Sequence, residues 1–389
     1  MTTVRPDTVQ VLLLEDAAQF PAYKDAWQAL ERETHQPCFF ESYAWCGHTA
    51  EVLSRTSPGQ YAPLVAVALR DGAPVAIWPL SRQRRSGVWQ LRALDDPFGQ
   101  FAGMLYSDAD TAHTLVTQTL DLVRQRRLAD VLHIDRVLSG TPLEAALLGR
   151  GAQIRGEVGA PVIDTLQWPS IEALKSSRNK KTMKNLRNSM NRLSKAGHHE
   201  HRVETGGAGV NSIVAETLRL RSAWLDTRGL TAPQFRSAAH EPILFGGDAW
   251  QLDSLRAAFE LRCGDKPIAY QWGFVHQNRY YAYMSATEPG AMLLSPGRLH
   301  LAFVVEEAMK LGVEGIEMLT PASDYKMVWT DTARRLVNLV LPLSAKGRVH
   351  DGVWEGAVRP ALKALFYALP VGWRRRAVPM DAAGAGDQE

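Results

Sequence analysis

A short stretch of this 389-residue chain occurs twice, with copies about 190 residues apart. Residues 69–76 read LRDGAPVA and precede Trp78, and residues 261–269 read LRCGDKPIA and precede Trp272. In each copy a strand-like run enters, Gly and Asp form the turn, and Pro begins the next strand, where its missing N–H is tolerated. Two similar β-hairpins at equivalent positions of two units are therefore predicted.

The segments that follow the two hairpins also correspond. A third strand is predicted after each hairpin, then a loop, an amphipathic helix and one more strand, at 88–94, 109–125 and 131–137 in the first copy and at 279–286, 298–311 and 315–319 in the second. Repeats of a solenoid would be far shorter than this spacing. The repeat therefore indicates a duplicated unit of mixed α/β fold class.

The boundary between the two copies is expected near residues 167–170, where a strand-like run stops and Ser170 can cap the next helix. This boundary predicts an N-terminal domain at 1–168 and a C-terminal domain at 169–378. Residues 379–389 are rich in Ala and Gly and show no periodicity, so a disordered tail is expected there.

The composition is that of a soluble, folded protein, with 46% hydrophobic and 22% charged residues. Its 44 Lys and Arg residues nearly balance its 41 Asp and Glu residues, which argues against a chain that binds nucleic acid over its whole surface. The three cysteines form no C-x-x-C pair, and neither a signal peptide nor an apolar run of membrane-spanning length is recognisable. A cytoplasmic location is expected.

Several common chemistries leave sequence marks that this chain lacks. It contains no G-x-x-x-x-G-K-[ST] phosphate loop, no G-x-S-x-G nucleophile turn and no H-E-x-x-H metal pair. In the run His198-His199-Glu200-His201, only His199 and His201 would share a face of a strand, so a solvated strand start is favoured over a metal site. No metal is expected.

The start of the helix expected near residue 298 is a candidate anion site. Ser295 is predicted as N-cap and Pro296 as the first helical residue, while Gly297 would allow close backbone approach and Arg298 adds a positive charge. Free N–H groups and the positive end of the helix dipole suit a pyrophosphate. The alternative is a plain helix cap.

A strongly basic helix is predicted over residues 171–196, where Glu172 is the only acidic residue. Met183, Leu186, Met190 and Leu193 define an apolar face that would pack on the domain. The opposite face would attract the phosphates of a donor, a tRNA or a lipid-linked sugar, or would simply be solvated.

A polar cluster follows the strand expected at 315–319. Asp324 could act as a base, Tyr325 as an acid and Lys326 as the partner of an oxyanion or a phosphate. The ends of strands in α/β sheets are where binding crevices form, which would suit acyl transfer. The alternative is that these residues only cap a loop.

Residues 266–274, 279–283 and 295–297, together with Asp324-Tyr325-Lys326 and Trp329, resemble GNAT-type acyltransferases of the CelD/FemAB-like group. The resemblance implies two tandem GNAT-like domains with a mixed sheet. It also implies transfer of an acyl group from acyl-CoA, such as acetyl-CoA, or from another thioester to an amine or a hydroxyl.

The resemblance, together with the positions of residues along the strands, suggests roles for particular residues. Asp324 would be the catalytic base with Glu317 in reserve, Tyr325 the acid and Lys326 a further catalytic residue, while Ser295, Pro296, Gly297 and Arg298 would hold the donor's phosphates. Gln271 and Tyr283 would line the acceptor pocket, with packing in the core as the alternative for strand aromatics. Asp96 of the first half could reach the same cleft or belong to a capped turn.

The acceptor expected from the resemblance is a sugar or a lipid-linked saccharide of envelope or exopolysaccharide synthesis. A non-catalytic partner of a polysaccharide synthase and an aminoacyl-tRNA-dependent transferase are the alternatives, although no helical-hairpin insertion of the tRNA-using enzymes is recognisable and no specific nucleic acid is expected.

Residues 358–366 predict an amphipathic helix before the basic run 373–376; packing on the protein body is favoured there over peripheral membrane contact.

Overall fold

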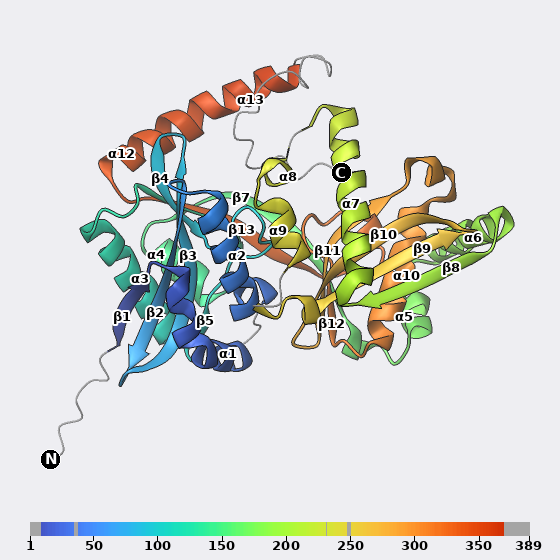
Figure 1. The fold of residues 1–389 in the computed structure, drawn as a ribbon, viewed down its shortest axis with the longest axis horizontal. Coiled ribbons are helices and arrows are strands. Elements are labelled where there is room, and N and C mark those ends of the chain that lie inside the picture. The colour runs from blue at the N-terminus through green and yellow to red at the C-terminus, as the bar shows by residue number, and fades with distance from the viewer. Residues whose placement is uncertain (1–8, 35–37, 231, 247–249, 369–389) are drawn as a thin grey trace. The chain divides into compact units, whose positions relative to one another are not determined.

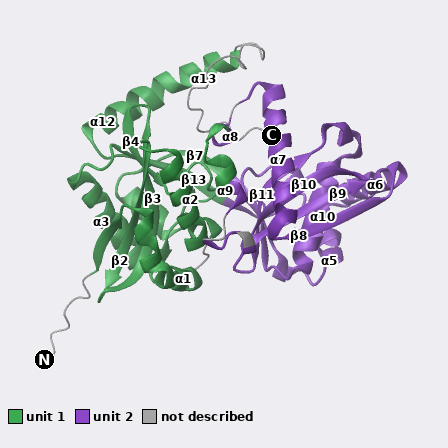
Figure 2. Ribbon diagram, in the orientation of Figure 1, with its two compact units in different colours: residues 1–158, 236–243, 335–374 green, residues 159–235, 244–334, 375–389 purple. Residues whose placement is uncertain are grey.

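The fold of this computed structural model is mixed α/β, as the sequence predicted (Figure 1). The structure describes residues 9–34, 38–230, 232–246 and 250–368. Within these residues the chain forms two compact units, shown in Figure 2. Unit 1 is drawn from 1–158, 236–243 and 335–374, and unit 2 from 159–235, 244–334 and 375–389.

The sheet of unit 1 follows the order β1-β2-β3-β4-β6-β13. All neighbours are antiparallel except β4 and β6, which are parallel. The strands are β1 (Gln10–Leu14), β2 (Tyr61–Arg70), β3 (Ala73–Arg85), β4 (Val88–Ala93), β6 (Val131–Leu138) and β13 (Ala333–Pro342), with a short β5 (Leu105–Tyr106) against β3. The first predicted hairpin is the β2–β3 pair.

The sheet of unit 2 repeats this order as β8-β9-β10-β11-β12-β7. Here too a single pair of neighbours, β11 with β12, is parallel, and the other neighbours are antiparallel. The strands are β7 (Gln153–Asp164), β8 (His199–Thr205), β9 (Arg256–Cys263), β10 (Lys266–His276), β11 (Arg279–Thr287) and β12 (Gly315–Glu317). The second hairpin is β9–β10, so the predicted duplication is present in the structure.

Each half of the chain contributes its last strand to the other unit. Residues 162–164 of β7 pair with β12 of unit 2, and residues 336–342 of β13 pair with β6 of unit 1. The compact units therefore differ from the continuous division into 1–168 and 169–378. Hydrophobic periodicity reports that a segment is a strand but not which sheet it completes. The predicted tail at 379–389 lies outside the described residues.

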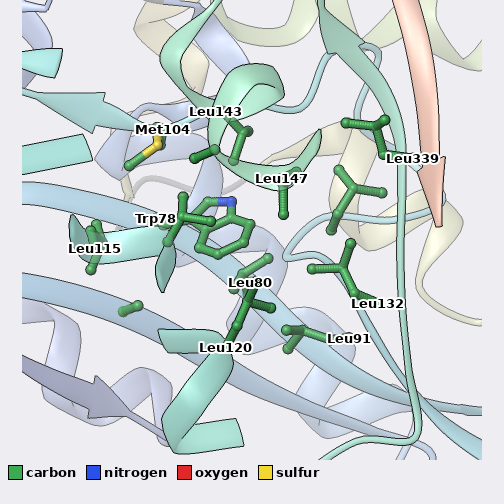
Figure 3. Packing of buried hydrophobic residues seen from close by; sticks show 14 of the residues in the cluster. Trp78, Leu80, Leu91, Met104, Leu115, Leu120, Leu132, Leu143, Leu147 and Leu339 are labelled. Atoms are coloured by element: carbon green, nitrogen blue, oxygen red, sulfur yellow. The ribbon is translucent and has the colours of Figure 1, made fainter. Parts of the chain in front are cut away.

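Helices α3 and α4 cover one face of the unit 1 sheet and form its main core (Figure 3). Trp78 of β3 lies there among Leu115, Leu120, Leu143 and Leu147. The helices assigned wholly or mainly to this unit are η1 (Ala17–Tyr23), α1 (Lys24–Glu33), η2 (Phe39–Glu41), α2 (Tyr43–Thr56), α3 (Ala109–Gln125), α4 (Pro142–Gly149), α9 (His240–Phe245), α12 (Ala345–Val349), the π-helix η7 (His350–Val358) and α13 (Arg359–Ala368). The predicted helix at 358–366 lies within the last two, whereas 373–376 lies outside the described residues.

In unit 2, α10 supplies the core residues Val304 and Val305, which pack with Phe259 and Tyr280 of the sheet. The other helices of the unit are η3 (Thr165–Gln167), α5 (Ile171–Ser177), α6 (Lys180–Ala196), α7 (Gly207–Arg228), α8 (Pro233–Arg236), η5 (Asp253–Leu255), η6 (Pro289–Leu294), α10 (Pro296–Lys310) and α11 (Asp324–Met327). No helix in the described ranges is both long enough and apolar enough to span a bilayer.

The single basic helix predicted over 171–196 is two helices in the structure. Ser170 caps α5 as expected, because its side chain accepts a hydrogen bond from the Ala173 N–H. Arg178 is extended, and the Asn179 side chain caps α6 by accepting from the N–H groups of Lys181 and Thr182. Asn is a strong N-cap and a weak helix former, which accounts for the break.

Two buried carboxyl groups lie among aromatic side chains of unit 1. Glu41 accepts a hydrogen bond from the Cys38 N–H at 3.0 Å, and Asp95 accepts from the Trp45 indole N–H at 2.5 Å. Burial, reinforced by the negative charge of Asp95, raises the pKa of Glu41 to about 8. Burial likewise raises the pKa of Asp95 to about 7. Both groups favour the protonated form because removing a charge from water is costly.

Glu41→Gln should make unit 1 less sensitive to alkaline pH. In the unfolded chain a Glu titrates near 4.5, so the folded protein binds more protons than the unfolded chain up to about pH 8, and stability falls across this window as pH rises. The lost contribution of Glu41 is on the order of 5 kcal/mol above pH 8. Denaturant unfolding at pH 5, 7 and 9 should show a flatter pH profile for the variant.

Glu33→Gln is the matched control, because Glu33 is exposed on α1 and its charge remains in water. Its unfolding free energy should follow the parent profile at every pH. If Glu41→Gln and the parent lose stability equally between pH 5 and 9, the carboxyl of Glu41 is not a protonated buried group.

Candidate functional site

The candidate site of unit 2 lies where β11 and β12 separate. The two strands pair only from Arg279 to Tyr281 against Gly315 to Glu317. β12 ends at Glu317, while β11 continues to Thr287 along β10. Among the described residues, the last part of β11 therefore has no parallel strand beside it. Edges left open in this way expose backbone groups that a ligand can bind.

Tyr325 of α11 reaches this open edge. The Ser285 hydroxyl of β11 interacts with its phenol, and the positive charge of Arg221, from α7, acts on it. Burial raises the pKa of Tyr325 above its ordinary value, although Arg221 and Ser285 both oppose the rise. The phenol is thus protonated at neutral pH and has a cation near it that would stabilise a phenolate.

Gln271 and Tyr283, the predicted acceptor residues, take different positions. Gln271 is buried and stands directly opposite Ser285 in the β10–β11 ladder, which places it on the same sheet face as the Ser285 side chain. Its amide donates to the Trp272 carbonyl at 3.1 Å. The ring of Tyr283 packs on Trp272 and Phe274 at centroid distances of 5.0 and 5.5 Å. Gln271 therefore joins the candidate site, while Tyr283 belongs to an aromatic cluster.

Lys326 holds the turn that connects β12 to α11. Its ammonium donates to the carbonyls of Leu319, Thr320 and Pro321 at 3.1 to 3.3 Å. Leu319 has a positive φ of 56°, which is unfavourable for a side chain of this size. The charged hydrogen bonds of Lys326 offset that cost, so this side chain acts on the shape of the loop that carries Tyr325.

Asp324 is exposed at the first position of α11. Its neighbour Ser323 is the N-cap but makes no side-chain capping bond. The structure therefore places the predicted base at the solvent side of the loop that carries Tyr325 and Lys326.

Glu317, the residue predicted as the reserve base, is buried and paired with two arginines. Its carboxylate accepts from Arg279 at 2.6 Å and from Arg334 at 2.8 Å, and only 2% of its side chain is exposed. A carboxylate held by two guanidinium groups has its oxygens engaged in charge-assisted hydrogen bonds. Its role in the structure is to fix β11, β12 and the chain entering β13.

The start of α10 lies beside the end of β11. Pro296 is its first residue, as predicted, and a side chain at Gly297 would contact the Thr287 methyl at 3.6 Å. Ser295 is the N-cap by position, but it is left-handed with φ 55° and its side chain makes no capping bond, contrary to the prediction. No acidic residue occupies the first turn, and Arg298 is exposed there. This helix end keeps its positive character.

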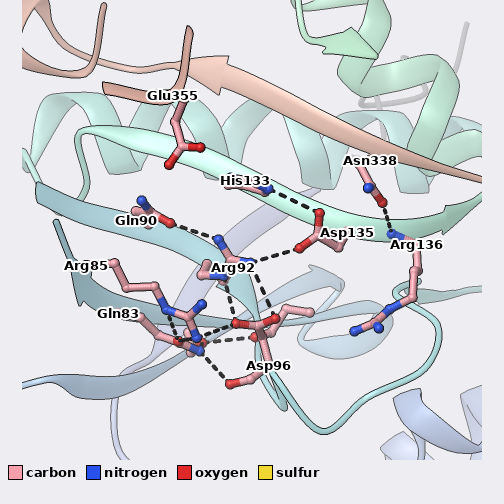
Figure 4. Close-up of polar contacts among 12 residues, drawn as sticks. Gln83, Arg85, Gln90, Arg92, Asp96, His133, Asp135, Arg136, Asn338 and Glu355 are labelled. Carbon is pink, nitrogen blue, oxygen red and sulfur yellow. Dashed lines mark hydrogen bonds and ion pairs between the residues drawn. The ribbon is translucent and has the colours of Figure 1, made fainter. Parts of the chain in front are cut away.

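The equivalent place in unit 1 is closed by the protein itself (Figure 4). Beyond the short β4–β6 pairing, Ala102 forms a parallel bridge to Val137 of β6. Arg92 of β4 is buried and binds both Asp96 at 2.8 Å and Asp135 of β6 at 2.9 Å. Loop and ion pairs thus occupy the edge that is open in unit 2.

Asp96, the proposed acceptor contact from the first half, belongs to this network. Arg85 binds the same carboxylate at 2.6 Å. Although burial opposes it, the charges of Arg92 and Arg85 hold the pKa of Asp96 below its ordinary value. Its hydrogen-bonding capacity is therefore engaged inside unit 1.

The helix that follows the closed edge, α3, also differs from α10. Asp108 caps it by accepting from the Thr111 N–H at 2.7 Å, and Asp110 lies in its first turn. These carboxylates neutralise the helix end that would otherwise attract a phosphate. Only α10 of the two equivalent helices has an N-terminus suited to an anion.

Sequence reasoning missed Arg221, Ser285 and Arg279. Ser285 follows an aromatic stretch of β11, which was a usable signal for a polar position on that strand. Arg221 lies 104 residues from Tyr325 on a helix with many charges, so the sequence gives no reason to pair the two. Their proximity depends on how α7 crosses the sheet.

The described part of the chain contains no group of three or more His, Cys, Asp or Glu side chains arranged to hold a metal. His199 and His201 lie on β8, as expected for a strand start. The His201 ring stacks on Phe303 of α10 with centroids 3.4 Å apart, so it packs against unit 2.

A comparison with protein families finds a match that lies mostly in the second half of the chain. Residues 180–327 match the family model of the acetyltransferase (GNAT) domain. No curated protein matches the sequence. The expected mixed α/β fold class is confirmed, and the strand order of unit 1 repeats that of unit 2, which contains most of the matched residues.

Among solved structures, FemX is similar with a TM-score of 0.55 at 11% identity, over 82% of this chain and 96% of FemX. The C-terminal domain (DUF2156) of a protein assigned as a lysylphosphatidylglycerol synthetase from Agrobacterium fabrum has a TM-score of 0.52 at 13% identity, over 84% of this chain and 94% of that domain. A tandem GNAT protein from the clavulanic acid pathway has a TM-score of 0.48 at 12% identity, over 87% and 99%. At sequence identities this low, the similarity to these structures shows the fold alone.

Glu317→Gln should destabilise unit 2 because it leaves Arg279 and Arg334 without their shared counter-charge in a buried setting. The expected loss is roughly 3 kcal/mol in the free energy of unfolding, measured by denaturant titration at pH 7. Glu314→Gln, an exposed change next to the same strand, should cost less than about 0.5 kcal/mol. Equal stability of the two variants would contradict the structural role of Glu317.

Proposed function

We propose that this chain is a GNAT-type N- or O-acyltransferase whose unit 2 binds acyl-CoA, or another thioester with a phosphate-bearing carrier. The observation that carries the proposal is the open edge between β11 and β12, with the Tyr325 phenol beside Ser285 and Arg221. The family match to residues 180–327 supports transferase chemistry in this unit.

The start of α10 would hold the phosphates of the donor. Free N–H groups near Gly297, the helix dipole and the Arg298 charge all favour an anion at this end. The acidic start of α3 would repel the same group. One donor site per chain, in unit 2, follows from this difference.

The reaction that fits these residues is attack of an amine or hydroxyl on the thioester carbonyl. The new C–N or C–O bond forms, the C–S bond breaks, and the leaving thiolate takes a proton. Tyr325 supplies that proton, since its raised pKa keeps the phenol protonated until the thiolate develops. The charge of Arg221 then stabilises the phenolate until it regains a proton from solvent.

The proton released by the acceptor passes to Asp324, whose exposed carboxylate sits one residue before Tyr325. Lys326 acts as a positioning residue through the three carbonyls that it holds. Glu317 stays paired with its arginines and has no proton-transfer role in this scheme.

The acceptor in this proposal is an amino or hydroxyl group of a sugar or lipid-linked saccharide, in keeping with the CelD/FemAB-like resemblance. The Gln271 amide oxygen, on the face shared with Ser285, would accept a hydrogen bond from a hydroxyl of such a group. Incubation with acetyl-CoA and a panel of amino sugars, with detection of free thiol, tests the activity. Silence across acyl lengths and acceptors would favour a non-catalytic partner of a polysaccharide synthase.

Tyr325→Phe should lower kcat about 100-fold or more while leaving the KM for acetyl-CoA within a factor of two, because the phenol acts on the leaving group. Thiol release under saturating acceptor measures both constants. Tyr23→Phe, in unit 1, removes a hydroxyl outside unit 2 and should leave both unchanged. Full activity of Tyr325→Phe would remove this residue from the mechanism.

Arg298→Gln should raise the KM for acetyl-CoA roughly tenfold with little change in kcat, because the lost charge contacts the carrier and not the reacting carbonyl. Lys310→Gln changes the same charge at the other end of α10, where the ammonium pairs with Glu306 and Glu307. That variant should keep the parental KM. An unchanged KM in Arg298→Gln would place the donor's phosphates elsewhere.

A further inference from the structure

Helix α6 carries a dense row of positive charge on one side. Its exposed cations, called the α6 cations below, are Lys180, Lys181, Lys184, Arg187, Arg192 and Lys195. At 100° per residue they fall within an arc of about 140°, and the helix is about 25 Å long. The opposite side holds Leu186, Met190 and Leu193, which pack on unit 2. The charged arc therefore faces away from the protein.

The α6 cations have no counter-charges in the described structure. α6 contains no acidic residue, and no ion pair is formed by any of these side chains within the described ranges. The preceding basic residues behave differently, since Lys175 pairs with Glu306 and Arg178 with Asp331. A self-contained protein surface normally mixes the two signs, so this one-sided row would attract an anionic partner.

An exposed apolar turn packs against the same helix. Ala291 and Leu294 of η6 belong to the cluster that buries Leu193 of α6. Between them, Met292 is 63% exposed and Leu293 is 91% exposed. A leucine side chain this exposed buries almost no apolar surface in the folded protein, although it could be buried in an apolar layer outside it.

We propose that α6 and η6 dock this protein on an anionic lipid bilayer, with the α6 cations at the headgroups and Leu293 inserted at the headgroup boundary. Positive charge next to exposed apolar side chains is the combination that binds such an interface. RNA would also attract the charges, but α6 has no aromatic side chain for base stacking and RNA would leave Leu293 in water. The lipid surface explains both features.

Vesicle flotation of the full chain tests this docking. At about 100 mM salt the protein should float with vesicles of phosphatidylcholine and phosphatidylglycerol in equal parts, and stay behind with phosphatidylcholine alone. The triple change Lys180→Gln, Lys184→Gln and Arg187→Gln should weaken binding at least about tenfold. Leu293→Ser should weaken it severalfold.

Matched controls separate the surface from general charge and hydrophobicity. Arg55→Gln, Arg84→Gln and Arg127→Gln together remove as many exposed charges from unit 1, and Leu166→Ser changes a leucine of unit 2 that is 75% exposed. Both controls should float as the parent does. Circular dichroism melts should show that every variant is folded.

The docking proposal fails on any of three outcomes of the vesicle experiment and on one outcome with tRNA. The parent ignores phosphatidylglycerol vesicles, or the α6 triple variant floats as well as the unit 1 control, or soluble glycerol phosphate at millimolar concentration displaces the protein, which would indicate a site for a free phosphate. Preferential binding of tRNA that is lost in the triple variant and unaffected by Leu293→Ser would assign the surface to RNA instead. None of these readouts depends on acyl transfer.

Discussion

Both units depend on a short parallel pairing between the strand that follows the hairpin and the strand that follows the helix. These strands are β4 and β6 in unit 1 and β11 and β12 in unit 2. Each pairing covers only two or three residues, so in each unit some backbone N–H and C=O groups along these strands need partners outside the pairing. Unit 1 closes that edge with Ala102 and the Arg92 ion pairs. Unit 2 leaves it beside Ser285 and Tyr325. One fold thus yields a unit whose edge is bridged by a loop and ion pairs and a unit whose edge carries Ser285 and Tyr325.

Charge is buried in different ways in the two units. In unit 1 the Arg92–Asp96–Asp135 network pairs its charges, while burial raises the pKa of Glu41 and of Asp95 and so disfavours their charged forms. In unit 2 Glu317 fixes two arginines, and Lys326 supports the strained Leu319 turn. The buried ion pairs thus stabilise the scaffold, whereas the proposed mechanism draws on Arg221 and Arg298.

Much of the fold could be predicted from local sequence. Alternation gave the strands, as in β6, where Leu132 and Ile134 join the core and His133 and Asp135 point to the polar face. The hairpins and the helix start at Pro296 also follow from short-range rules. The break at Asn179 was missed because the basic residues continue on both sides of it.

Only part of the candidate site could be predicted from local sequence. The loop with Tyr325 could be found, since polar residues after a strand are a local signal. By itself, the sequence determined the duplication, the strand and helix types and the basic helix, all of which depend on neighbours along the chain. Tertiary structure alone decided that β7 and β13 complete the opposite units, that Glu317 is locked between arginines and that Arg221 meets Tyr325. These depend on contacts between distant segments, which no local pattern encodes.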